Sequence, residues 1–279
     1  MLSREDLVQV FWDTMELCKL DAGLSGAVRA SVKGTRLYKE DEEIELPQPA
    51  AGPLTVMVSK ERSFEAARRM LALCPGERVA VHNFASATNP GGGVKNGSRA
   101  QEEALCRIST LYPVLATKAN FRDYYDYHRA RHDVRYTDRV IYTPGIVVLK
   151  SDTDAPVTLP EEERCQVDVI TCAAPNLRRR LYNEANRGAA AQLSETELFN
   201  MHVQRARQML RAAAANGAKV LVLGAFGCGA FANDPKVVAQ AYAKVLPEFA
   251  GYFRHVNFAV YCPPGSTTQN YEVFARVLS

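Results

Sequence analysis

The stretch "AKVLVLGAFGCGAFANDPKVVAQAYAKVL", residues 218–246, contains an apolar run, a glycine-rich turn and a second apolar segment in direct succession. The first run has the length and aliphatic composition of a buried β-strand. The second segment, 236–246, repeats its apolar residues at helical spacing, and Asp234 with Pro235 forms a favourable helix start. A strand that turns directly into a helix is the building unit of α/β proteins, so the stretch predicts that fold class.

The same alternation of strands and helices continues outward from this stretch. Strands are expected within 54–60, 78–85, 165–176 and 255–264, and helices within 63–73, 100–115, 195–216 and 270–278. Ser63 is a candidate N-cap, and Gly217 follows the longest helix in the position that a C-cap favours. The segment 121–152 is less regular. The pattern predicts a mostly parallel or mixed sheet with helices on both faces.

The first fifty residues differ from the rest of the chain. Residues 4–21 place apolar side chains at helical spacing, which predicts an amphipathic helix. Residues 33–53 are charged and then proline-rich, which is typical of an extended arm or linker. We therefore expect an N-terminal helical extension and linker over 1–50, and a second domain over 51–279.

Composition and charge exclude several classes of protein. The 279 residues include 34 basic and 31 acidic side chains, too even a balance for the broad basic surface of a general nucleic-acid-binding protein. No run of about 18 apolar residues and no signal peptide is recognisable, so we expect neither a membrane span nor secretion. Seven cysteines without a C-x-x-C pair indicate neither a disulfide framework nor a thiolate zinc site, and they predict a reducing, cytoplasmic compartment.

Two glycine-rich turns each follow a predicted strand. In open α/β sheets, ligands bind outside the carboxyl ends of the strands, so the two turns predict one composite site. Gly224, Gly227 and Gly229 allow consecutive N–H groups to converge on an anion such as a phosphate or pyrophosphate. The segment matches neither G-x-x-x-x-G-K-[ST] nor G-x-G-x-x-G. A tight turn between strand and helix is the alternative interpretation.

The other turn, "NPGGGVKNGSRAQEEALC" at 89–106, leads into two adjacent acids. Glu102 and Glu103 fall in the first turn of a predicted helix, where neighbours point about 100° apart and can have separate roles. A partly desolvated carboxyl beside another carboxylate has a raised pKa and can act as the general acid that glycosidic bond cleavage requires. Alternatively, both acids stabilise the helix N-terminus, each by about 0.3–1 kcal/mol.

Together the two segments resemble the microbial type of poly(ADP-ribose) glycohydrolase, a macrodomain family. The signature of that family is three glycines, six to eight variable residues and Gln-Glu-Glu, which Gly91-Gly92-Gly93, residues 94–100 and Gln101-Glu102-Glu103 match without a gap. The flanking "NFASATNPGGG" and "LCRISTLYP", with the later "GAFGCGAFANDP", extend the resemblance over roughly residues 50–279. It implies a macrodomain-like three-layer α/β/α sandwich with a mixed sheet, preceded by the N-terminal extension.

The resemblance also implies roles for individual residues. Glu103 is expected to protonate the leaving oxygen and then activate water, and Glu102 to bind the hydroxyls of the reacting ribose. Gly91, Gly92 and Gly93 are expected to let their loop pass beside that ribose and the pyrophosphate. The second phosphate loop is expected to consist of Gly224, Gly227, Cys228, Gly229 and Ala230, with Phe231 packing near the reactive ribose.

Further residues are candidates for substrate contacts. Asn89 is expected to bind ribose hydroxyls, or else to be a turn residue constrained by the following proline. Gln101 completes the signature and is a candidate substrate-binding residue. Tyr261 is expected to stack on adenine, or else to be an ordinary aromatic at the core edge. Ala225 departs from the asparagine of the animal enzymes, so any amide contact there is absent or comes from elsewhere.

No metal or cofactor is required by this chemistry. His128 and His132 are four residues apart but lack the glutamate of H-E-x-x-H, and a solvated basic helix face is the favoured interpretation. Cys228 lacks a recognisable partner histidine, so its thiol is interpreted as a small packing group and not a nucleophile.

The expected activity is hydrolysis of ribose–ribose O-glycosidic bonds in poly(ADP-ribose), mainly from chain ends, with release of ADP-ribose. One alternative is removal of a single ADP-ribose from an arginine, an acidic side chain or a nucleic acid. Another is a non-catalytic ADP-ribose reader, against which the intact Gln-Glu-Glu argues. The expected partners are ADP-ribose, its polymer or ADP-ribosylated proteins, and the sequence does not indicate an oligomeric state.

Overall fold

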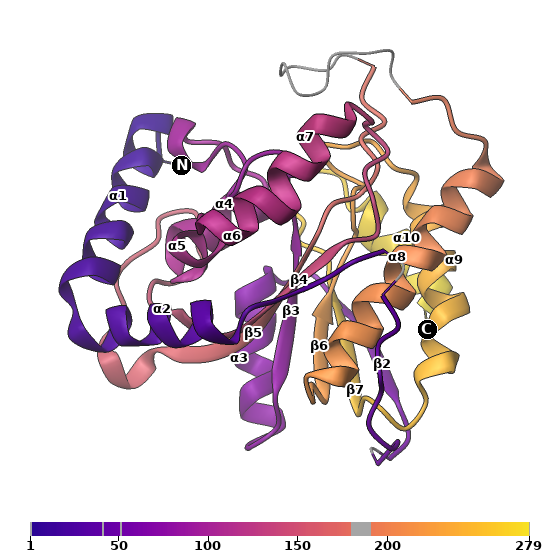
Figure 1. Ribbon diagram of the computed structural model, residues 1–279, viewed down its shortest axis with the longest axis horizontal. Coiled ribbons are helices and arrows are strands. Elements are labelled where there is room, and N and C mark those ends of the chain that lie inside the picture. The colour runs from indigo at the N-terminus through magenta and orange to yellow at the C-terminus, as the bar shows by residue number, and fades with distance from the viewer. Residues whose placement is uncertain (1, 41, 51, 180–190, 279) are drawn as a thin grey trace.

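A mixed seven-stranded sheet forms the centre of the computed structural model, which describes residues 2–40, 42–50, 52–179 and 191–278 (Figure 1). The strands are β1 (Arg36–Tyr38), β2 (Thr55–Ser59), β3 (Val79–Phe84), β4 (Val140–Val148), β5 (Cys165–Cys172), β6 (Val220–Leu223) and β7 (His255–Ala259). Their order is β1-β4-β5-β3-β6-β7-β2. β1 and β5 pair antiparallel with β4, and the pairs from β5 to β2 are parallel. The predicted mixed sheet is confirmed.

Helices cover both faces of this sheet, as the three-layer prediction requires. The helices are α1 (Arg4–Leu20), α2 (Ala22–Gly34), α3 (Ser63–Leu73), α4 (Gln101–Ile108), α5 (Leu111–Leu115), α6 (Lys118–Asn120), α7 (Tyr127–Arg131), α8 (Glu195–Ala215), α9 (Pro235–Val245) and α10 (Gln269–Leu278). The shorter turns are η1 (Val94–Asn96), η2 (Phe121–Asp126), η3 (Glu161–Glu163) and η5 (Leu246–Phe249). α8, α9 and α10 lie on one side, and α1 to α5 on the other (Figure 1).

The alternation of side chains along β6 shows how the sequence produces two cores. Leu221 and Leu223 point into the core shared with α8, α9 and α10. Val220 and Val222 point into the opposite core, with α3, α4 and α5. Successive side chains of a strand face opposite sides of the sheet, so a continuous apolar run is buried on both faces.

The N-terminal segment contains more structure than the sequence indicated. The helix expected at 4–21 is α1, and Ser3 caps it by accepting a hydrogen bond from the Asp6 N–H at 3.0 Å. α2 was not predicted, because three glycines weaken its helical pattern. The arm expected over 33–53 contributes β1 to the sheet, so it is more than a linker. The domain boundary at residue 51 stays a prediction.

Several predicted elements differ in their limits. The helix expected over 100–115 is divided into α4 and α5 at Ser109, which is extended and whose hydroxyl bonds both flanking helices. Ser63 is not an N-cap: Arg62 holds that position, and the Ser63 hydroxyl accepts a hydrogen bond from Gln101. By contrast, Asp234 caps α9 as expected, and Gly217 follows α8 with a positive φ of 78°.

Two further observations concern membrane-spanning helices and the cysteines. Within the described ranges, no helix combines the length and the apolarity that a bilayer crossing needs. All seven cysteines are free thiols.

Candidate active site

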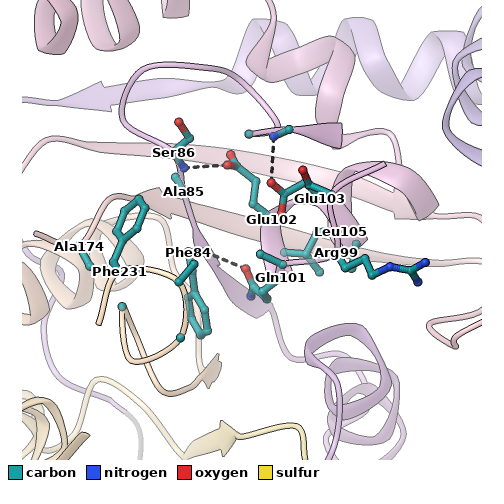
Figure 2. Close-up of a pocket in the computed structure, with 18 of the residues that line it drawn as sticks. Phe84, Ala85, Ser86, Arg99, Gln101, Glu102, Glu103, Leu105, Ala174 and Phe231 are labelled. Carbon is teal, nitrogen blue, oxygen red and sulfur yellow. Dashed lines mark hydrogen bonds between the residues drawn. The ribbon is translucent and has the colours of Figure 1, made fainter. Parts of the chain in front are cut away.

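The two glycine-rich loops line one cavity at the carboxyl ends of β3, β6 and β7. Its volume is about 1250 Å³. The loop after β3 contributes residues 85–86, 88–90 and 92–93, the loop after β6 contributes residues 225–227 and 229–231, and Tyr261 follows β7. The predicted site residues Gly91, Gly224 and Cys228 lie outside this lining. The composite site expected from the sequence is therefore present, and both acids of the signature line it (Figure 2).

Glu102 is almost completely buried, and the protein holds both of its carboxyl oxygens. Oε2 accepts a hydrogen bond from the Ser86 N–H at 2.7 Å, and Oε1 accepts one from Asn83 Nδ2 at 3.3 Å. Burial and the neighbouring Glu103 carboxyl raise the pKa of Glu102 to about 8. The pair of carboxyls therefore retains a proton at neutral pH, and the raised pKa falls on Glu102, whereas the resemblance gives the role of general acid to Glu103.

Glu103 has a different environment. Its Oε1 accepts a hydrogen bond from the Gly93 N–H at 2.9 Å, whereas its buried Oε2 has no hydrogen-bond partner (Figure 2). Buried carboxyl oxygens in proteins are normally hydrogen-bonded, so the unpaired Oε2 means that the protein holds the Glu103 carboxyl less completely than the Glu102 carboxyl. One carboxyl is fixed by the protein and the other is partly free, as two separate roles require.

The glycine loop passes directly over the two acids. Gly92 has a positive φ of 55°, and a Cβ there would lie 2.5 Å from Glu103 Oε1 and 3.1 Å from Glu102 Oε2. Both the backbone conformation and the space exclude a side chain. The glycine triplet therefore brings the backbone against the carboxyls.

The second loop is shaped by Asn233. This buried side chain donates hydrogen bonds to the carbonyls of Pro175 at 2.8 Å and of Gly227 at 3.2 Å, and it accepts one from His202 of α8 at 2.8 Å. Gly227 has a φ of 75°, and a Cβ there would lie 2.5 Å from Ala174 Cβ. Sequence reasoning missed Asn233, because a short polar residue before a helix cap has no distinctive pattern.

The other predicted residues of this loop differ in their exposure and packing. Gly229 and Ala230 are exposed, and a Cβ on Gly229 would meet nothing within 4 Å. Phe231 packs against Tyr136, with ring centroids 6.2 Å apart. Cys228 packs against the core, and burial raises the pKa of its thiol far above the usual range, which agrees with a packing group.

Gln101 lines the cavity, but its carboxamide is already occupied. Oε1 accepts a hydrogen bond from the Phe84 N–H at 2.8 Å, and Nε2 donates to the His82 carbonyl at 2.6 Å and to Ser63 Oγ at 2.9 Å. These bonds attach the start of α4 to the end of β3. The structure thus gives Gln101 a positioning role, and a substrate contact stays a prediction.

Asn89 and Tyr261 are each joined to an arginine that the sequence did not single out. Asn89 Oδ1 accepts a hydrogen bond from Arg129 of α7 at 3.0 Å. The Arg62 guanidinium lies 3.9 Å from the centroid of the Tyr261 ring and donates to its hydroxyl at 2.8 Å. One face of the Tyr261 ring is therefore covered, and an adenine would have to stack on the other.

The histidine pair is not a basic helix face, so that interpretation was wrong for His128. Its ring is buried and bonds the Tyr124 carbonyl at 2.7 Å and Thr137 Oγ1 at 3.0 Å, because the helix packs inward at this point. His132 is exposed and ends α7. In the part of the chain that the structure describes, no cluster of three His, Cys, Asp or Glu residues could hold a metal ion.

Comparison with known proteins identifies the family. The model of the microbial-type PARG catalytic domain matches residues 18–151. The poly(ADP-ribose) glycohydrolase (PARG) of Thermomonospora curvata superposes with a TM-score of 0.81 at 35% identity, over 98% of this chain and 99% of that one. The chain belongs to the microbial-type PARG family. The resemblance inferred from the signature is thereby confirmed.

Two liganded PARG structures are also similar to this chain. The T. curvata PARG bound to the inhibitor ADP-HPD superposes with a TM-score of 0.78 at 34% identity, covering 98% of this chain and 99% of that one. The Deinococcus radiodurans PARG in complex with ADP-ribose has a TM-score of 0.74 at 36% identity, covering 90% and 97%. Proteins with curated functions gave no match.

Proposed function

We propose that this chain is a poly(ADP-ribose) glycohydrolase that cleaves ribose–ribose O-glycosidic bonds and releases ADP-ribose. The observation that carries the proposal is the environment of Glu103, which one backbone N–H fixes and whose second oxygen is free of protein partners. Its family relatives from T. curvata and D. radiodurans are named for this activity, and one of them holds ADP-ribose.

The chemistry follows from the two acids and the loops that hold them. The proton that the coupled pair retains is donated from Glu103 to the departing ribose oxygen as the bond from that oxygen to the anomeric carbon breaks. The resulting carboxylate then takes a proton from a water molecule that attacks the oxocarbenium-like carbon. Glu102 positions the hydroxyls of the same ribose, and the loop from Gly224 to Ala230 carries the pyrophosphate on its backbone N–H groups.

Hydrolysis of two substrate classes tests the proposal directly. Automodified polymer and defined mono-ADP-ribosylated peptides, one carrying the modification on arginine and one on glutamate, are incubated side by side with the chain. We expect release of ADP-ribose from the polymer. An untouched polymer together with a cleared peptide would instead establish the mono-ADP-ribosyl hydrolase alternative.

Binding without turnover would distinguish a non-catalytic ADP-ribose reader from an enzyme. Calorimetric binding of ADP-ribose combined with no release from any substrate would establish a reader. The buried and orphaned Glu103 Oε2 favours the enzyme, because a protein that only binds ADP-ribose gains nothing from an unpaired buried carboxyl oxygen.

The proposal includes two finer statements. The enzyme acts mainly on chain ends, as the resemblance to bacterial family members implies, and it works in the cytoplasm, where its seven free thiols stay reduced. The length distribution of polymer remaining at partial digestion tests the first, since an end-directed enzyme shortens chains gradually and leaves no free oligomers. Fractionation of the source cells tests the second.

A further inference from the structure

The cavity extends to both sides of the acid pair. Phe231 and Tyr261 line it on the side of the second glycine loop, and Arg4, Lys95 and Arg99 also line it. Figure 2 shows Phe231 and Arg99 on opposite sides of Glu102 and Glu103. If the released ADP-ribose occupies the loop side, the leaving group must occupy the side of the three cations.

The start of α1 and the segment before α4 supply these cations, and hydrogen bonds join the two segments. Arg4 begins α1, Lys95 lies in η1, and Arg99 precedes α4. Arg99 donates a hydrogen bond to the Leu2 carbonyl. Arg107 donates to the Leu7 carbonyl at 3.2 Å and to the Ser98 carbonyl at 2.5 Å. The N-terminal extension therefore forms part of the cavity wall beside the catalytic loop.

The three cations differ from Arg62 and Arg129, which also line the cavity, in their pairing with acids. Arg129 is paired with Asp126 at 2.9 Å, and Arg62 is paired with Asp154. Of the two acids in the first turn of α1, Asp6 accepts the Ser3 N–H at 2.7 Å and caps the helix, and Glu5 is exposed. Among the described residues, Arg4, Lys95 and Arg99 form no ion pair with a carboxylate, which leaves their positive charge available for an anion.

An exposed aromatic side chain lies beside these cations. Trp12, the single tryptophan of the chain, is 48% exposed. Lys95 Nζ lies 5.9 Å from the Trp12 ring and 5.3 Å from the Tyr112 ring, and Tyr112 lines the cavity. Aromatic side chains next to cations are the combination that binds a base and its phosphates.

We propose that Arg4, Lys95, Arg99 and Trp12 form a leaving-group subsite for a second ADP-ribose unit of the polymer. The three cations bind its pyrophosphate, and the indole of Trp12 stacks on its adenine. This inference rests on the proposed function, since a modified arginine or glutamate side chain offers neither a pyrophosphate nor a base. It also gives the N-terminal extension a direct part in substrate selection.

Tryptophan fluorescence tests the subsite without turnover. Protein-free poly(ADP-ribose) and monomeric ADP-ribose are titrated separately into Glu103→Gln protein. We expect the polymer to quench the indole emission and saturating ADP-ribose to leave it nearly unchanged. Because Trp12 is the single tryptophan of the sequence, any change in indole emission reports on that side chain. An unchanged emission with bound polymer would overturn the proposal.

Kinetics with two substrates that differ in their leaving group test whether the cations bind the leaving group of the polymer. The p-nitrophenyl glycoside of ADP-ribose shares the ADP-ribose part of the polymer but has a leaving group without phosphate. In Arg4→Ala/Lys95→Ala protein we expect the ratio of kcat/KM for polymer to kcat/KM for the glycoside to fall about five- to tenfold. Lys19→Ala/Lys33→Ala, which removes two exposed cations of α1 and α2, should keep the parent ratio.

The outcomes separate the subsite from the proposed function. An unchanged ratio in the Arg4→Ala/Lys95→Ala protein would overturn the subsite while leaving polymer hydrolysis intact. A parent chain that cleaves the glycoside but not the polymer would overturn the proposed function, and the fluorescence titration would then decide the subsite alone.

Discussion

Adjacent Glu102 and Glu103 differ in what their carboxyl oxygens contact, and this difference supports the roles that we propose for them. Both oxygens of Glu102 accept hydrogen bonds from protein nitrogens, whereas Glu103 Oε2 accepts none. A carboxyl that the protein already saturates is suited to holding a substrate in place. A carboxyl with an unused oxygen is suited to proton transfer, so the geometry favours Glu103 as the acid.

The first prediction concerns Glu103→Gln. The amide keeps the volume and can still accept the Gly93 N–H, but it has no proton to donate. We expect polymer hydrolysis to fall by about 10²- to 10⁴-fold while ADP-ribose affinity, measured by calorimetry, stays within about threefold. Glu16→Gln, which changes an exposed acid of α1, is the matched control. Near-parent turnover in Glu103→Gln would refute the assigned role.

The second prediction concerns Glu102 and pH. Its pKa of about 8, against an ordinary 4.5, means that the folded chain keeps a proton which the unfolded chain releases. The corresponding stability is full below about pH 4.5 and is lost as the pH rises to about 8. Glu102→Gln should therefore flatten the decline of Tm from pH 5 to pH 8, relative to the parent and to Glu16→Gln. A parallel decline in all three would contradict the raised pKa.

The amide that Glu102→Gln introduces has a partner available in this experiment. Asn83 Oδ1 is buried without a hydrogen bond, and a rotation of the Asn83 amide would let that oxygen accept from the new side-chain N–H. The carbonyl of the new side chain can still accept the Ser86 N–H. The substitution therefore removes the ionisation and keeps the contact between residues 83 and 102, while the rotation moves Asn83 Nδ2 away from Thr171 Oγ1.

At the scale of elements, Asn233 holds the second glycine loop through hydrogen bonds, and two glycines of this loop differ in the space available for a side chain. Gly227 combines a positive φ with close contacts to Ala174 and Asn233, whereas Gly229 has open space around it. The third prediction is that Gly227→Ala lowers the free energy of unfolding by about 1–3 kcal/mol and weakens ADP-ribose binding. Chemical denaturation and calorimetry measure the two effects.

Gly229→Ala is the matched comparison in the same loop. Because its Cβ would meet no protein atom within 4 Å, we expect its unfolding free energy to equal that of the parent. Any loss of ADP-ribose affinity in this variant would then come from contact with the ligand. Equal destabilisation by both substitutions would contradict the assigned constraint on Gly227.

The elements show why some of the fold was predictable and some was not. β6 and α8 are long or strongly apolar, so periodicity alone located them. α2 contains glycines, and β1 has three residues and depends on pairing with β4. Such elements are stabilised by tertiary contacts and not by local preference, so the sequence alone did not predict them.

The sequence also predicted only part of the candidate site. The signature located both acids and both loops, but Arg62 and Arg129 reach the cavity from α3's N-cap and from the irregular segment before β4. Nothing in their local sequence marks them, because the contacts with Tyr261 and Asn89 span 199 and 40 residues. The raised pKa expected for a carboxyl of this pair is present on Glu102, and its causes are burial and the adjacent Glu103 carboxyl.

At the scale of the whole molecule, the N-terminal extension is built into the catalytic half of the fold. α1 packs against α4 and η1, which carry the acids and the glycine loop. Thr14 of α1 donates a hydrogen bond to the Arg107 carbonyl at 2.6 Å, and Lys150 after β4 donates to the Val10 carbonyl at 2.9 Å. The extension thus braces α4 from the side opposite the sheet (Figure 1).

The fourth prediction tests this brace through Arg107, whose buried guanidinium joins the Leu7 carbonyl of α1 to the Ser98 carbonyl of the catalytic loop. Arg107→Met keeps the apolar stem but leaves both carbonyls without their donor. We expect the free energy of unfolding to fall by about 1–3 kcal/mol and kcat to fall as the loop loosens, whereas Arg211→Met, an exposed change on α8, should alter neither. Denaturation and single-turnover kinetics separate the two effects. A destabilised Arg107→Met protein with parent kcat would limit the extension to a role in stability, because the catalytic loop would then keep its geometry without α1.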